Sequence, residues 1–207
     1  MNVFYKVCIV FALIAAMGIT AFLPLLSPHS FSGRQAEQNQ TSHTISSKEK
    51  TPASSSKARP VSWNKPSGGS YPVIGKNEPL WIDVAIKKQK VYIKSGSRTL
   101  YTMQASTGLD SSPDTTTPTG TYYIQAERGK WFYSPKYKEG AKYWVSWKNH
   151  GEFLFHSVPM NQNKQVLPAD AANLGKKDSH GCIHLTVPDA KWVYEHIPYN
   201  TKVVIHA

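Results

Sequence analysis

The segment 179–184, SHGCIH, contains the residue types needed for nucleophilic chemistry. A cysteine attacks as its thiolate, so Cys182 needs a base or a positive field nearby, and histidine titrates closest to neutral pH. Gly181 leaves room for an approaching carbonyl and backbone N–H groups for a developing oxyanion. The six residues alone leave three interpretations open: a nucleophile, an inert thiol, or a metal site built from Cys182, His180 and His184.

Three histidines are candidates for the base. If residues 180–184 are extended, His180, Cys182 and His184 lie on one face of a strand, so either neighbour could accept the thiol proton. His156 is a distant candidate at the end of the apolar run 153–155, and it could equally be a structural histidine at a strand end. Spacing does not choose among them, because catalytic partners meet in space rather than in sequence.

The N-terminal segment indicates in which compartment the Cys182 thiol lies. Residues 7–26 form a nearly unbroken apolar run without charge, long enough to span a bilayer, and Lys6 precedes it. Because Ile19-Thr20-Ala21 is a poor cleavage site, the run favours an uncleaved membrane anchor over a cleaved signal, with the remainder extracytoplasmic. Cys8 lies in or beside this segment, which leaves Cys182 without a disulfide partner. An unpaired thiol in an oxidising exterior favours the nucleophile interpretation.

Charge and composition set the remaining bounds. The chain of 207 residues has 24 Lys and Arg against 13 Asp and Glu, a formal charge of +11. These charges are scattered, which argues against nucleic-acid binding and suits retention at an anionic cell envelope. A solvated surface explains the same charge equally well. Residues 27–79 are rich in Ser, Thr, Gln, Lys and Pro and predict a disordered linker. Residues 80–207 are long enough for one well-buried domain.

That domain is predicted to be mostly β, a single compact β-sandwich-like fold. Apolar residues alternate in the first segment, and turn signals separate it from later ones. Two short helices are expected, one over 168–174 that ends at Gly175, and one that starts with a capping-box-like Thr186-Val187-Pro188-Asp189. The second helix should place Ala190, Val193, Tyr194 and Ile197 on one face. The expected strands cover residues 80–86, 91–93, 99–105, 121–124, 142–147, 152–156 and 201–206.

Three short segments carry a family resemblance. Residues 155–157 (FHS) and 179–182 (SHGC), preceded by 117–122 (TPTGTY), resemble the catalytic domain of the bacterial L,D-transpeptidases, the YkuD-type family. The similarity extends roughly over residues 80–205. A histidine followed by a Ser-His-Gly-Cys signature, on a β-rich domain behind an export segment, is specific to this family.

The resemblance implies a mechanism. Cys182 would attack the carbonyl of the third residue of a peptidoglycan stem tetrapeptide and expel the terminal D-Ala. The acyl group would then pass to an amine of a neighbouring stem, in a 3-3 type cross-link, without metal or organic cofactor. His156 would accept and donate the proton, oriented by the main-chain carbonyl of Ser157. Backbone groups beside the nucleophile would form and support the oxyanion hole: Ser179, His180, Gly181 and Cys182.

Two features depart from the family pattern. His156 and Cys182 are 26 residues apart, more than is usual, and the surplus contains the helix expected over 168–174, interpreted as a lid or substrate wall. Residue 184 is histidine where arginine or asparagine is common. His184 would be either a weaker, pH-dependent anchor for a substrate carboxylate or a structural residue.

Other functions stay open at this level. With water as the acceptor, the same site would act as an L,D-carboxypeptidase. The domain could instead be a non-catalytic wall-binding module that holds glycan or anionic polymer through aromatics such as Trp144 and Trp147. A zinc-dependent hydrolase is a further alternative.

Overall fold

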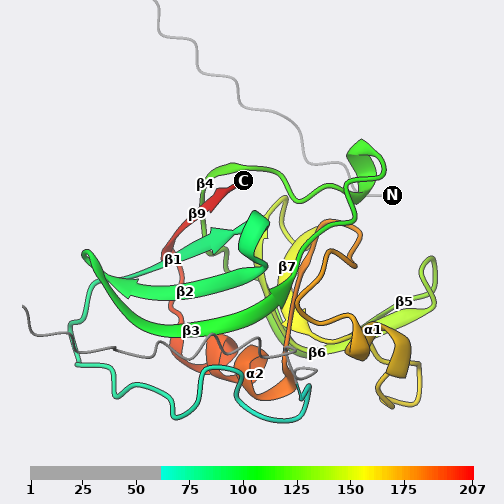
Figure 1. Ribbon diagram of the computed structural model, residues 1–207, viewed down its shortest axis with the longest axis horizontal. Helices are drawn as coiled ribbons and strands as arrows, with labels where there is room; N and C mark the ends of the chain where they lie inside the picture. Colours follow the sequence, from blue (N-terminus) through cyan, green and yellow to red (C-terminus); the bar gives the residue numbers. More distant parts are fainter. Residues whose placement is uncertain (1–61) are drawn as a thin grey trace, which may run out of the picture. The chain divides into compact units, whose positions relative to one another are not determined.

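The computed structural model describes residues 62–207, and the fold is mostly β, as predicted (Figure 1). Two α-helices, α1 (Pro168–Ala172) and α2 (Val187–His196), and two 3-10 turns, η1 (Ile86–Lys88) and η2 (Pro113–Thr115), accompany the strands of this part of the chain. The strands are β1 (Leu80–Ala85), β2 (Lys90–Ser95), β3 (Arg98–Ser106), β4 (Gly120–Tyr123), β5 (Arg128–Ser134), β6 (Glu139–Lys148), β7 (Phe153–Ser157), β8 (Ile183–Leu185) and β9 (Lys202–His206).

The strands form one continuous sheet in the order β4-β9-β1-β2-β3-β8-β7-β6-β5. In place of the expected sandwich-like arrangement the domain has a single curled sheet, with β1 to β3 on one side in Figure 1 and β5 on the other. Strands β1 and β9 pair in parallel, as do β7 and β8, and the other neighbours are antiparallel. The parallel β7–β8 pair joins two segments that are separated in the sequence by the residues containing α1.

Apolar alternation explains the strands that the sequence predicted. In β1 the side chains of Ile82 and Val84 are fully buried, whereas Asp83 between them is partly exposed. Helix α2 packs against β6, β7 and β8. Its predicted apolar face is confirmed, because Ala190 and Val193 are buried in the main core, and Thr186 caps its N-terminus by accepting a hydrogen bond from the Asp189 amide.

The sequence missed two strands. In β5 no residue is buried and nearly all are partly exposed, so the strand lacks a clear apolar period. Strand β8 has only three residues, all buried, and alternation cannot be detected over so short a run. Helix α1 ends at Ala172, two residues before the predicted end.

The folded domain begins earlier than the predicted boundary at residue 79. Asp189 of α2 is fully buried, and its Oδ2 accepts hydrogen bonds from the N–H and the Oγ–H of Ser67, at 3.1 and 2.5 Å. Its Oδ1 accepts from the Tyr71 hydroxyl at 2.9 Å, and Tyr71 stacks on Trp192 with ring centroids 5.8 Å apart. Residues 62–79, assigned to the linker from composition, therefore include a strap bound to α2.

The predicted anchor, residues 7–26, and the linker up to residue 61 lie outside the described residues. Among residues 62–207, no helix has the length and apolar character required to cross a membrane.

Candidate active site

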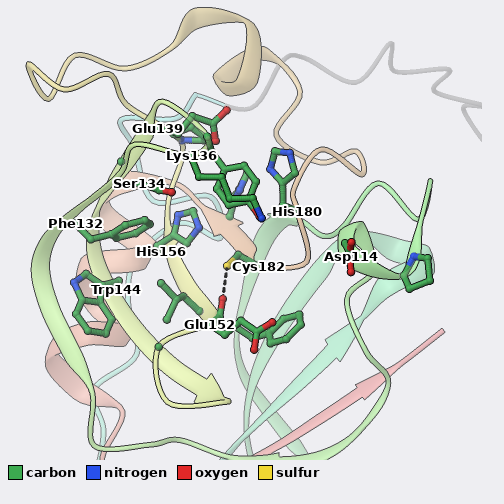
Figure 2. Close-up of a pocket in the computed structure, with 18 residues that line it drawn as sticks. Asp114, Phe132, Ser134, Lys136, Glu139, Trp144, Glu152, His156, His180 and Cys182 are labelled. Carbon is green, nitrogen blue, oxygen red and sulfur yellow. Dashed lines mark hydrogen bonds between the residues drawn. The ribbon is translucent and has the colours of Figure 1, made fainter.

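The parallel pairing of β7 with β8 brings His156 to the SHGC signature. His156 lies opposite His184 and Phe155 opposite Ile183, so Cys182 comes directly before the paired residues. His156 and Cys182 line the same pocket, which has a volume of about 550 Å³ (Figure 2). The structure thus brings together the two residues that the sequence placed 26 positions apart.

The His156 imidazole has a defined orientation. Its Nδ1 lies 2.7 Å from the main-chain oxygen of Ser157. A carbonyl oxygen only accepts, so Nδ1 carries the proton and Nε2 is the basic nitrogen. The Phe132 ring packs edge-on against the imidazole, with centroids 5.4 Å apart. Burial lowers the pKa of His156 to about 4, against a smaller opposing effect of the Ser157 hydrogen bond, so the ring is neutral at pH 7.

Cys182 is protonated in the same arrangement. Its Sγ donates to the main-chain oxygen of Glu152 over 3.6 Å, the contact dashed in Figure 2. The pKa of the Cys182 thiol is raised to about 11, chiefly by burial; the Leu154 amide opposes this rise and the negative charge of Glu152 adds to it. The pocket therefore contains a neutral thiol and a neutral imidazole.

Gly181 is required by both conformation and space. Its φ of +108° favours glycine, and a Cβ there would lie 2.8 Å from the Phe153 ring and 3.1 Å from the Thr116 oxygen. The space beside Gly181 that the sequence suggested for a substrate carbonyl thus holds the Phe153 ring and the Thr116 carbonyl. The Gly181 N–H donates to Ser179 Oγ at 3.1 Å, and that hydroxyl donates to the Cys182 oxygen at 2.5 Å. Ser179 therefore fixes the turn that carries Cys182.

Thr117 is a supporting residue whose role the sequence did not indicate. Its side chain is buried, and Oγ1 donates to the Gly181 oxygen at 2.9 Å while accepting from the Gly108 amide at 2.8 Å. Thr117 belongs to the TPTGTY segment that supported the family resemblance, so the sequence marked this position without indicating the hydrogen bonds that it makes. Thr117 links the loop after β3 to the turn before Cys182.

A buried glutamine provides a second support. Gln89 bonds to Thr107 twice, through Nε2 to Oγ1 at 2.7 Å and from the Thr107 N–H to Oε1 at 2.8 Å. The Thr107 oxygen in turn accepts from the amides of Asp178 and Ser179, at 2.8 and 3.1 Å. Nothing in the local sequence distinguishes Gln89 from an exposed turn residue.

His180 and His184 occupy different environments. The exposed His180 ring stacks on Tyr137 at the pocket rim, with centroids 4.4 Å apart. His184 is 5 % exposed, its ring centroid is 4.8 Å from that of His156, and its Nδ1 has no hydrogen-bond partner among residues 62–207. Burial, with the nearby His156 and His180, holds the pKa of His184 well below its usual range. A neutral His184 could donate a hydrogen bond but would not be the cationic anchor considered from the sequence.

The walls of the pocket combine aromatic and charged side chains. Strand β5, which the sequence missed, supplies Phe132, and β6 supplies Trp144 and Glu139. Of the predicted lid, residues 168–174, none lines the pocket. Within residues 62–207 no three His, Cys, Asp or Glu side chains are grouped closely enough to hold a metal ion.

Comparisons with known proteins agree with this geometry. A family model described as the L,D-transpeptidase catalytic domain matches residues 79–205. The chain is 52% identical over 193 residues to YciB of Bacillus subtilis (strain 168), whose name assigns it provisionally to the L,D-transpeptidases. That alignment covers 93% of this chain and 96% of YciB.

Two solved structures share the fold. An L,D-transpeptidase from Mycobacterium smegmatis superposes with a TM-score of 0.50 at 22% identity. LdtMt1 in complex with imipenem gives 0.50 at 20% identity. Each comparison covers 62% of this chain and 59% of the other, so the chain spans about three-fifths of those structures. With the family match over residues 79–205, these findings show that the chain belongs to the L,D-transpeptidase catalytic domain family.

Proposed function

We propose that this protein is an exported peptidoglycan L,D-transpeptidase with Cys182 as its nucleophile and His156 as its proton carrier. The observation that carries the proposal is the hydrogen bond from His156 Nδ1 to the Ser157 oxygen. It leaves Nε2 as the basic nitrogen in the pocket that also contains Cys182.

The first half of the reaction forms a thioester. As Cys182 Sγ attacks the carbonyl carbon of the third stem residue, the thiol proton moves to His156 Nε2. The tetrahedral intermediate then collapses, the C–N bond to the terminal D-Ala breaks, and His156 returns the proton to the departing amine. The products are an acyl-enzyme on Cys182 and free D-Ala.

The second half transfers the acyl group. An amine of a neighbouring stem attacks the thioester and gives a proton to His156, and the C–S bond breaks as the sulfur regains a proton. Water in place of the amine would make the enzyme an L,D-carboxypeptidase. Because both catalytic groups rest in neutral form, the site does not stabilise a buried ion pair between turnovers.

The oxyanion would be bound by backbone N–H groups around His180, Gly181 and Cys182. The Gly181 N–H donates to Ser179 Oγ in the unligated protein, so using it would require exchange of that partner for the substrate oxygen. Ser179 therefore has a supporting role in the proposal, through the position of Gly181 and of the Cys182 carbonyl.

Export is a proposal that rests on residues 7–26, whose apolar length suits a membrane anchor. The anchored domain would act at the cell wall, where stem peptides are its substrates and anionic wall polymers attract its positive charge. Protease treatment of intact cells tests this: an extracytoplasmic domain is cleaved without lysis, and a protected domain would refute the proposed location.

Product analysis tests the reaction itself. The purified protein is incubated with a soluble stem tetrapeptide, with and without an amine acceptor. We expect D-Ala release and a cross-linked product that requires the amine, both absent in Cys182→Ala. Hydrolysed tripeptide as the only product would favour the carboxypeptidase. Full activity in Cys182→Ala would refute the assignment of the nucleophile.

A further inference from the structure

A second groove, of about 590 Å³, lies beside the active site and has no part in the proposed chemistry. It is formed by β4, the residues that follow β4, the end of β6 with the β6–β7 turn, and the turn before β9. Strand β4 is the first strand in the sheet order, so the groove lies at an edge of the sheet. It is outside the pocket that contains Cys182, because no residue lines both.

The groove exposes two tyrosines among polar side chains. Tyr123 is 51% exposed and Tyr199 is 69% exposed, and amide side chains such as Asn149 and Asn200 line the same groove. An exposed aromatic ring has an apolar face that water solvates poorly. Flat rings beside amides suit a ligand with apolar C–H faces and polar edges, which is the chemistry of a pyranose sugar.

Two unsatisfied polar atoms belong to residues that line the groove. Trp147 is 1% exposed, and its indole Nε1 has no hydrogen-bond partner within the described residues. Glu127 Oε2 is also buried without a partner there, although Oε1 of the same carboxylate pairs with His150 at 2.8 Å. An unpaired buried polar group costs about 1–3 kcal/mol. Both atoms lie beneath the surface of the groove, so the polar groups that face a ligand there are the exposed amides of Asn149 and Asn200, which both accept and donate.

The charge of the groove favours a neutral ligand over an anionic polymer. Among its lining residues Glu127 and Lys148 carry opposite charges, so the groove has no positive cluster that would select an anionic polymer. A carboxylate repels phosphate or carboxylate groups on a ligand. The Tyr71–Trp192 stack, by contrast, is a packing contact of the strap with α2 and presents no groove.

One turn separates this groove from the nucleophile. His150 lines the groove, Gly151 and Glu152 line the catalytic pocket, and the Glu152 oxygen lies 3.6 Å from Cys182 Sγ. Two steps along the chain take His150 Cα to Glu152 Cα, at most about 7.6 Å. Three extended residues of a stem peptide span about 10 Å. A stem attached to a sugar held beside His150 would therefore match the length of this turn.

We propose that this groove binds the glycan strand of peptidoglycan, a neutral β-linked amino-sugar polymer, with Tyr123 and Tyr199 as stacking platforms. The presentation of the stem to Cys182 rests on the proposed transpeptidase function, whereas the binding of glycan does not. Of the two tryptophans considered for sugar binding from the sequence, Trp147 is buried and offers no stacking face, and Trp144 lines the catalytic pocket rather than this groove.

Binding is measured with a hexamer of β-1,4-linked N-acetylglucosamine, by calorimetry on the full chain and the double variant Tyr123→Ala/Tyr199→Ala. Removing two stacking rings should weaken binding at least tenfold. Tyr92→Ala, a partly exposed tyrosine on β2 away from the groove, is the matched control and should bind as the unmodified chain does. Tyr199→Trp should retain binding, because it retains the ring face. Thermal unfolding of each variant checks that the fold is intact.

Activity then tests stem presentation. In the double variant the KM for stems carried on glycan should rise at least tenfold more than the KM for a free tetrapeptide. Hexamer binding that is unchanged in the double variant, or no hexamer binding by the unmodified chain, overturns the glycan site. Equal rises in the two KM values overturn stem presentation. Tyrosine-dependent hexamer binding without transpeptidase activity on any donor would refute the proposed function and leave the groove supported.

Discussion

The protonation state of Cys182 gives the sharpest prediction about the site. The perturbation is a change of pH from 6 to 10 in the absence of substrate, and the observable is the rate of alkylation of Cys182 by iodoacetamide. Burial is the largest cause of the raised thiol pKa of about 11, and His156, with a pKa of about 4, is neutral over the whole range. The free enzyme should therefore contain almost no thiolate near neutrality.

The expected rate follows from these values. At pH 7 a thiol with a pKa of about 11 is ionised in about one molecule in 10,000, roughly 300-fold less than an ordinary cysteine with a pKa of about 8.5. The greater intrinsic nucleophilicity of the more basic thiolate recovers about tenfold of this loss. We expect alkylation of Cys182 about 20 to 30 times slower than that of a free cysteine at pH 7, with a tenfold rise per pH unit up to pH 10.

The assay follows the modified Cys182 peptide by mass spectrometry after digestion, which separates it from Cys8. In His156→Ala the alkylation rate should change by no more than about threefold, because a neutral imidazole does not generate the thiolate, whereas acyl transfer should fall by about 10² to 10⁴. A rate that levels off below pH 8 and drops sharply in His156→Ala would reveal a preformed thiolate–imidazolium pair and refute this reasoning.

Three substitutions test the support of the site. Gly181→Ala combines an unfavourable φ with a Cβ 2.8 Å from the Phe153 ring, so urea denaturation should show a loss of about 1–3 kcal/mol; unchanged stability would contradict the packing argument. Thr117→Val leaves the Gly108 N–H and the Gly181 oxygen unpaired, so it should lower the free energy of unfolding by a similar amount and lower kcat more than it raises KM. Thr117→Ser, which retains the hydroxyl, is the control and should restore stability and kcat. Asp189→Asn weakens the charge-assisted hydrogen bonds to Ser67 and should lower the free energy of unfolding by about 2 kcal/mol. Residues 62–79 should then become sensitive to limited proteolysis. Cleavage rates equal to those of the unmodified chain would contradict the role of the strap.

The parts of the fold that the sequence predicted are those with a regular apolar period. The alternation of Ile82 and Val84 marks a strand buried on one face, and the cap at Thr186 marks the start of α2. Strand β5 has no such period because its residues are nearly all partly exposed. The strap was missed because a few side chains anchor it, such as Tyr71, in a segment whose overall composition indicates disorder.

The candidate site was predictable in its residue types but not in its geometry. Cys182 could be proposed as a nucleophile from its neighbours and its lack of a disulfide partner, whereas its partner could not be chosen from spacing, because His156 reaches it through the parallel β7–β8 pairing. The lowered pKa of His184 arises from burial beside another histidine, a tertiary effect that no local pattern contains. Contacts between distant segments account for most of what the sequence did not indicate.

The most direct test of the central claim is the mass of the protein shortly after mixing with a stem tetrapeptide and no acceptor. We expect an acyl-enzyme that carries the tripeptide, formed with release of one D-Ala and located on Cys182 by fragmentation. We also expect that His156→Ala forms this adduct far more slowly. Steady product formation with the acyl group on another residue, or with no covalent adduct under conditions that trap thioesters, would contradict the claim.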